Sequence, residues 1–105
     1  MALLLESDNV LKITGARDED TLVYLNSGTA TYTICPAGST TPISGGTGSL
    51  SYQVGTDGNY SGVVDATVLT PPNVVDGSFY DVKFKLVQGN YDRVWKQTLS
   101  AIYGQ

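Results

Sequence analysis

Histidine is absent from this 105-residue chain, and Cys35 is its single cysteine. Without histidine, neither a Ser-His-Asp triad nor a Cys-His pair can form. One cysteine cannot build a zinc site and has no partner for a disulfide within the chain. We therefore expect a non-enzymatic protein with no cofactor and no disulfide framework, in which Cys35 is a small buried hydrophobic residue.

Charged residues are scarce. They make up 15% of the chain, the net charge is −4, and the six Lys and Arg residues are spread along the sequence. A nucleic-acid-binding surface normally gathers basic residues to neutralise phosphates. We therefore expect neither nucleic acid nor an anionic membrane as a partner. The polar surface must come from Ser, Thr, Asn, Gln and Gly, a composition common on virion and extracellular β-proteins.

Long apolar runs are missing as well. Residues 2–5 are apolar, but no basic segment precedes them and Glu6 interrupts the run, which argues against a secretory signal. No run approaches the roughly 20 residues that span a bilayer as a helix. We expect the chain to be made in the cytosol.

What the sequence does contain is alternation of apolar and polar residues with a period of two, which is typical of half-buried strands. It is clearest over 80–87. We predict one domain over 1–105, all-β, built as an antiparallel β-sandwich of about seven strands, with a small β-barrel of the same strands as the alternative. The predicted strands are 10–13, 21–25, 29–34, 49–54, 60–68, 80–87 and 94–103.

Turn-forming residues separate these segments. Asn26-Ser27-Gly28, Asp57-Gly58-Asn59 and Gly89-Asn90 each stand between two predicted strands, where glycine can adopt a positive φ. The longest connection, 36–49, is rich in Gly, Ser and Thr and reads as a flexible polar loop. Loops of this length are usually functional or disordered.

The segment 76–82 indicates a specific structural feature. A Gly-containing turn leads to Tyr80 at the start of the clearest strand. This arrangement looks like a tyrosine corner, in which a tyrosine hydroxyl bonds to upstream backbone across a sandwich. We expect the partner near 69–72.

The C-terminal half carries a family resemblance. The stretches DGNYSGVVDATVL and DGSFYDVKFKL, followed after a turn by RVWKQTLSAIY, resemble small immunoglobulin-like or fibronectin-like proteins of tailed-bacteriophage virions. The matching residues are Tyr60-Ser61-Gly62, the span from Gly77 to Tyr80, and Trp95. The resemblance implies a head decoration, neck or tail component, and it transfers no catalytic residue to this chain.

The sequence gives weaker support to other functions and binding sites. Glycines 45, 46 and 48 lack the lysine of a phosphate-binding loop. Asp65 and Asp81 fall on the solvent-facing phase of two strands, as a solvated surface would place them. Calcium is a minority hypothesis, with oxygen ligands available at 18–20 and 57–59. The seven tyrosines and one tryptophan also allow a glycan-binding module.

We therefore expect a non-enzymatic structural protein of a virus particle, made in the host cytoplasm and located in the virion. The alternative is a β-sandwich binding module for a glycan or a cell-surface partner. We expect contacts with other virion proteins or with further copies of the chain. The expected interface residues are Leu3, Leu4, Leu5, Gly45 and Gly46, with loop 36–49 mobile in the isolated subunit. Alternatively, the leucines form an ordinary edge strand and the loop is a passive connector.

Overall fold

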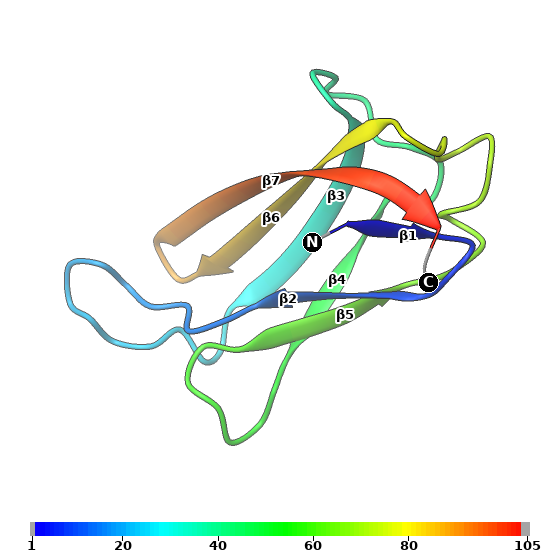
Figure 1. Cartoon of the computed structure of the whole chain (residues 1–105). Helices are drawn as coiled ribbons and strands as arrows, with labels where there is room; N and C mark the ends of the chain where they lie inside the picture. Colours follow the sequence, from blue (N-terminus) through cyan, green and yellow to red (C-terminus); the bar gives the residue numbers. More distant parts are fainter. Residues whose placement is uncertain (1, 104–105) are drawn as a thin grey trace.

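The computed structural model describes residues 2–103 (Figure 1). This part of the chain is built from seven strands, and it contains no helix long and apolar enough to cross a membrane. The predicted all-β class and the number of strands are confirmed. The strands are β1 (Leu3–Leu5), β2 (Asn9–Ile13), β3 (Thr29–Pro36), β4 (Thr47–Tyr52), β5 (Tyr60–Val64), β6 (Phe79–Gln88) and β7 (Tyr91–Tyr103).

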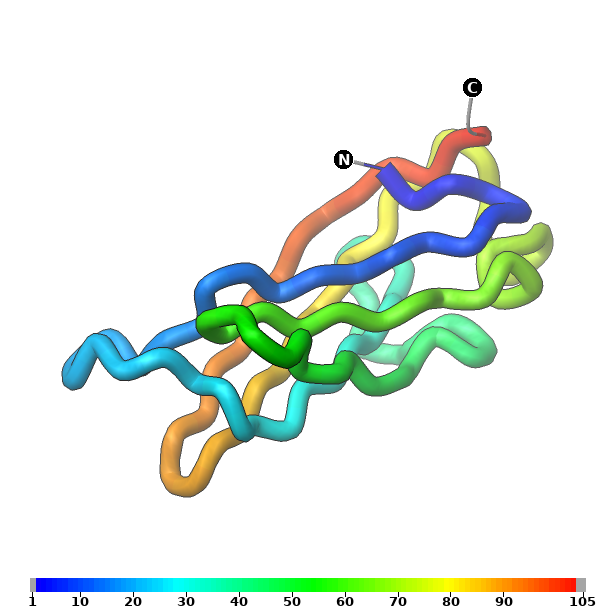
Figure 2. The backbone as a smooth tube through the Cα atoms, turned by 90° about the horizontal axis from the view of Figure 1, so that it is seen from below, coloured from blue at the N-terminus to red at the C-terminus, as the bar shows by residue number. Residues whose placement is uncertain are grey.

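The strands form one mixed sheet in the order β1-β7-β6-β3-β4-β5-β2. Neighbours run antiparallel, except that β1 is parallel to β7. Because β4 pairs with both β3 and β5, the two halves of the expected sandwich are joined, and the sheet curls until β1 lies beside β2 (Figure 2). The sheet is nearly closed and fits the β-barrel alternative, so the prediction of a purely antiparallel sandwich is only partly correct.

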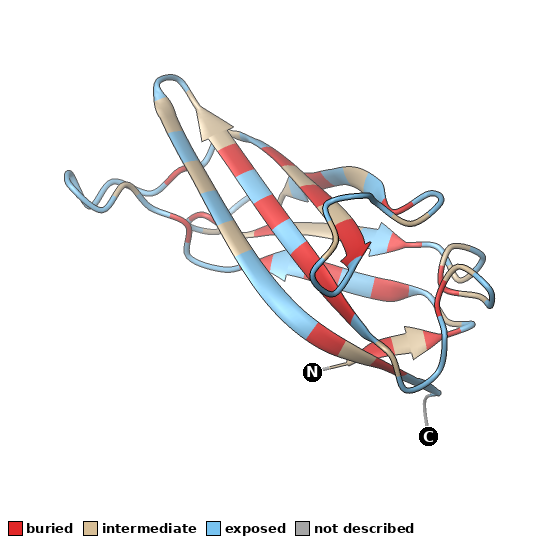
Figure 3. Ribbon diagram, turned by 90° about the horizontal axis from the view of Figure 1, so that it is seen from above, coloured by how far each residue is buried: buried red, intermediate tan, exposed pale blue. Residues whose placement is uncertain are grey.

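The core lies inside the curled sheet and follows the predicted alternation most clearly on β6. The even-numbered residues from Tyr80 to Leu86 are buried, whereas Lys83 and Lys85 are exposed (Figure 3). On β7, Leu99 and Ala101 continue the buried set. Fully burying a large apolar side chain contributes about 1.5–3 kcal/mol, so this inner face supplies much of the stability.

One predicted strand is replaced by another. Residues 21–25 form no strand, because the backbone before and within this segment bonds to Asp18. The Asp18 carboxylate accepts hydrogen bonds from the N–H groups of Asp20 and Thr21, and the Asp18 carbonyl accepts one from Leu22. Such local bonds compete with strand pairing. Only an isolated bridge between Arg17 and Tyr24 remains. The seventh strand is β1, which is too short to show alternation.

The two end strands of the sheet meet through a side chain. The buried amide of Asn9 accepts a hydrogen bond from the Leu4 N–H at 3.0 Å and donates to the Leu4 carbonyl at 3.0 Å. It also donates to the Ser7 carbonyl at 2.9 Å. Asn9 thus pairs with β1 as a peptide group of a neighbouring strand would, and it closes the seam between β1 and β2 at this end.

The connection between β3 and β4 is shorter than expected and makes contacts of its own. Strand β3 continues to Pro36 and β4 begins at Thr47. Between them, Ile34 accepts a hydrogen bond from the Ile43 N–H and donates one to the Gly46 carbonyl, while the Ile43 side chain packs against the core. The contact of Ile43 with the core was not predicted, because the glycine-rich composition obscured this one apolar residue. The mobility of the loop in an isolated subunit stays a prediction.

Two tyrosine hydroxyls bond to distant backbone. The Tyr80 hydroxyl accepts a hydrogen bond from the Val75 N–H at 2.8 Å, so the partner is closer in sequence than the expected 69–72. Tyr60, only 1% exposed, donates to the Leu25 carbonyl at 2.6 Å and accepts from the Gly28 N–H at 3.0 Å. Tyr60 therefore joins β5 to the segment that leads into β3, a contact that the sequence pattern did not predict.

Replacing Asn9 tests the closure of the seam. Asn9→Ala leaves both backbone groups of Leu4 without their partner, so we expect a loss of about 1–3 kcal/mol in the free energy of unfolding. Urea unfolding measures this loss. The control is Asn73→Ala, since the Asn73 side chain makes no hydrogen bond within residues 2–103. Equal stability of the two variants would contradict the structural role of Asn9.

Removing the hydroxyl group of Tyr60 or of Tyr80 compares how much each one contributes to stability. Tyr60→Phe unpairs a buried carbonyl and an N–H group, and we expect it to cost about 1–3 kcal/mol, whereas Tyr80→Phe unpairs only one N–H and should cost about 1 kcal/mol. Thermal unfolding followed by circular dichroism provides the comparison, with the more exposed Tyr24→Phe as control. A Tyr80→Phe loss larger than that of Tyr60→Phe would reverse the order we expect.

Candidate functional site

A groove of about 500 Å³ opens at the end of the molecule where β2 stops and the segment 14–28 leaves the sheet. Its floor is the inner face of β6 and β7, represented by Phe84 and Trp95, and its wall is the segment that follows β2. We name it the Trp95 groove. It is lined by Lys12, Ile13, Thr14, Gly15, Ala16, Arg17, Glu19, Leu22, Phe84, Arg93, Trp95 and Gln97.

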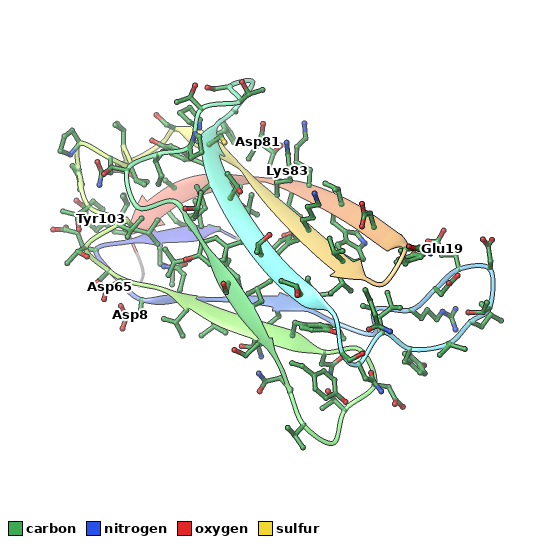
Figure 4. All side chains as sticks on the ribbon, turned by 180° about the vertical axis from the view of Figure 1, so that it is seen from behind. Asp8, Glu19, Asp65, Asp81, Lys83 and Tyr103 are labelled. Atoms are coloured by element: carbon green, nitrogen blue, oxygen red, sulfur yellow. The ribbon has the colours of Figure 1, made fainter. Side chains whose placement is uncertain are left out.

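Arg93 organises the polar part of the Trp95 groove. Its guanidinium carbon lies 4.9 Å from the centre of the Trp95 ring, in cation–π contact. The same guanidinium forms an ion pair with Glu19, which lies beyond the β6–β7 turn in Figure 4. Hydrogen bonding from Tyr91 and then Glu19 raises the pKa of Arg93. The groove therefore presents an aromatic surface beside a fixed cation.

The sequence pattern did not identify this groove. Trp95, which the sequence analysis considers only as part of the family resemblance, is partly buried and lines the groove. The available indication was Arg93, a charged residue in the inward phase of β7, two positions before Trp95. A long charged side chain in that phase is not expected in a closed core, because burying a charge is costly.

The predicted interface leucines belong to the chain's own core. Leu3 and Leu5 are buried, and β1 pairs with Ala101–Tyr103 of β7. The side chains of Leu3 and Leu5 fill the inner face beside β7, which favours the alternative in which the leucines form an ordinary edge strand. An interface role for Leu3 and Leu5 stays a prediction. Leu4 is half-buried, so its role as an interface residue stays a prediction.

Gly46 is needed for packing within the chain itself. It is buried, and a Cβ on this residue would lie 2.9 Å from the Ile34 carbonyl oxygen, so glycine is needed for the close approach of the two backbones. The close approach explains why glycine stands here, and the expected interface role of Gly46 stays a prediction. Gly45 is exposed and has a φ of +71°, and its role as a contact stays a prediction.

The oxygen-rich turns considered for calcium bond to backbone instead. The Asp18 carboxylate caps its own turn, and the Asn59 side-chain oxygen accepts from the Gly15 N–H at 2.8 Å. Within residues 2–103, no three Asp, Glu or Cys side chains come close enough to hold a metal ion. Cys35 is buried, where the sequence analysis placed it.

Asp81 is a buried carboxylate that the alternation assigned to the solvent face. It accepts a hydrogen bond from the Thr98 hydroxyl at 2.7 Å and one from the Gly38 N–H at 3.2 Å. These two bonds, the hydroxyl first, lower the pKa of Asp81, and Lys96 and Lys83 add a smaller effect of the same sign. Asp81 therefore ties the start of the β3–β4 connection to β6 and β7 (Figure 4).

No family model, curated protein or solved structure matches this chain.

The lowered pKa of Asp81 predicts a pH dependence. The folded pKa lies below that of the unfolded chain, so the contribution of Asp81 is fully present above about pH 4 and is lost as the pH falls through the folded value. Urea unfolding between pH 7 and pH 2 measures it. We expect Asp81→Asn to be less stable than the parent at pH 7 and to approach it at low pH.

The matched control for this titration is Asp57→Asn in an exposed turn. This substitution leaves both hydrogen bonds of Asp81 in place, so the loss of stability in acid that we assign to Asp81 should persist. A parent profile that Asp81→Asn does not flatten would show that the two hydrogen bonds add no stability. Asp65, whose pKa is lowered by the Thr67 N–H and hydroxyl, accounts for acid sensitivity that remains in Asp81→Asn.

Proposed function

We propose that this chain is a non-enzymatic structural protein of a virus particle, a head decoration, neck or tail component held in place by protein contacts. The resemblance of its C-terminal half to small immunoglobulin-like or fibronectin-like virion proteins motivates the proposal. The observation that carries it is an exposed apolar tip, formed by Leu22-Val23-Tyr24, beside the Trp95 groove. These side chains are 58%, 60% and 40% exposed.

The apolar tip is held in a fixed shape. Leu22 has a φ of +62°, a left-handed conformation that costs a non-glycine residue about 1–2 kcal/mol. Bonds from the Leu22 N–H to the Asp18 carbonyl and from the Asp18 N–H to the Val23 carbonyl maintain the turn. A strained backbone that presents large apolar side chains to solvent is typical of a contact surface.

The segment that bears the tip also projects away from the sheet. In Figure 2 the blue-to-cyan segment between β2 and β3 extends beyond the strands at one end of the molecule. A projecting, rigid, apolar turn can insert into a neighbouring subunit with little loss of conformational entropy. This arrangement favours a subunit in a larger assembly over an independent soluble domain.

A second candidate is glycan recognition in the Trp95 groove. One observation favours it: the indole ring of Trp95, the guanidinium of Arg93 and the amide of Gln97 all line the same open groove. Sugars stack on aromatic rings, and their hydroxyl groups form hydrogen bonds with planar polar groups such as a guanidinium or an amide. Because Trp95 is the only tryptophan, its fluorescence reports this groove directly. Saturable quenching by a saccharide would support the second candidate and argue against a purely structural role.

Analysis of purified particles tests the proposed function. We expect mass spectrometry of particles from the virus that encodes this chain to find it in stoichiometric amounts. Leu22→Gly should fold at least as stably as the parent, because glycine tolerates the positive φ, yet it should reduce incorporation into particles. The control is Val54→Ser, which removes a 93% exposed side chain outside the tip. Absence of the parent chain from particles refutes the proposal.

A further inference from the structure

Strand β7 has a long edge that β1 covers only in part. It spans 13 residues from Tyr91 to Tyr103, and β1 pairs only with its last three, Ala101–Tyr103. Over residues 92–98, no backbone group on this edge has a hydrogen-bond partner within the described chain. In Figure 1 this part of β7 continues past β1 as the outermost strand of its layer.

The register shows which groups face outward. Ala101 donates its N–H to the Ser78 carbonyl and accepts from the Gly77 N–H, so the backbone groups of Ala101 point toward the β6 side. Backbone direction alternates along an antiparallel strand. The odd-numbered residues of β7 therefore bond toward β6. The N–H and carbonyl groups of Asp92, Val94 and Lys96 point away from it, into solvent.

The side chains on the outer face of this edge carry opposite charges in a symmetric arrangement. Asp92, Val94 and Lys96 are exposed, and Val94 lies midway between the acid and the base. When two copies of β7 pair antiparallel about a two-fold axis at Val94, Asp92 of each lies opposite Lys96 of the other. Because all three residues point their backbone groups outward, each of these pairs is hydrogen-bonded.

The sheet already contains a repulsion that this pairing would offset. Lys96 lies directly opposite Lys83 on β6, and like charges opposite each other destabilise a sheet. Asp81 lies close enough to both lysines for them to lower its pKa, so it offsets part of this repulsion, and an acid on the free side of Lys96 adds to that effect. An uncharged strand on the same edge would leave Asp92 and Lys96 without partners of opposite charge. A second copy of this chain pairs both of them, so the charge pattern favours a second copy as the occupant of this edge.

We infer that the free edge of β7 joins a second copy of this chain, antiparallel and centred on Val94, so that the sheet continues across a two-fold axis. The inference depends on the edge and not on the proposed virion role. On the inner face, this register places Arg93 opposite Trp95 of the other copy, so the two Trp95 grooves adjoin. A single strand pair buries little surface, and the dimer should therefore be weak and reversible.

Backbone blocking provides the first test. In Val94→Pro the lost N–H pointed to solvent, a position where an edge strand tolerates proline. Sedimentation equilibrium from micromolar to millimolar concentration should show a monomer–dimer equilibrium for the parent and a folded monomer for Val94→Pro. The matched control is Val10→Pro on β2, the end strand on the opposite side of the sheet from β1 and β7, and it should dimerise like the parent. A parent that stays monomeric at millimolar concentration, or a Val94→Pro variant that still dimerises, overturns the inference.

Charge exchange provides the second test and holds even if the proline variant fails to fold. Asp92→Lys and Lys96→Asp each place like charges opposite one another twice per dimer, so each alone should dimerise about tenfold or more weakly than the parent. Mixed together, the two variants restore both opposite-charge pairs and should form a heterodimer of near-parental affinity. Variants that dimerise as well alone as when mixed would rule out this register, and with it the inference.

Discussion

Closing a single sheet upon itself is the constraint on which the rest of this structure depends. Seven strands in one sheet leave two end strands, β1 and β2, that must either meet or remain open to solvent. They meet through one side chain, because the Asn9 amide provides both the acceptor and the donor that the Leu4 peptide group requires. Since unpaired buried backbone groups cost free energy, this small contact determines where the sheet can close.

Closure at one end leaves the other end open. Strand β1 has three residues and covers only the last part of β7, so the rest of that edge is free. Where β2 ends at Ile13, no strand lies beside the inner face of β7, and this gap is the Trp95 groove. The groove, the free edge and the apolar tip thus have one origin, the short length of β1 and β2 compared with β7.

Alternation predicted the parts of the fold that depend on neighbours in sequence. It identified β6 and its buried face correctly, because a residue's place on one side of a pleated strand follows from its position alone. It was wrong over 21–25, where β-branched and aromatic residues suggested a strand but Asp18 bonds to the backbone. For Leu3 and Leu5 the sequence left an interface and an edge strand open, since three residues are too few to show a period.

The sequence by itself determined the all-β class, the inward face of β6, and the lack of a histidine for nucleophilic catalysis. Each of these follows from composition or from a period of two residues. Only the tertiary structure decided that the sheet is mixed and nearly closed, that Trp95 lines a groove, and that Asp92 and Lys96 lie on a free edge. Those features depend on which strands become neighbours and on their relative lengths, because pairing between distant segments leaves no periodic trace in either segment alone.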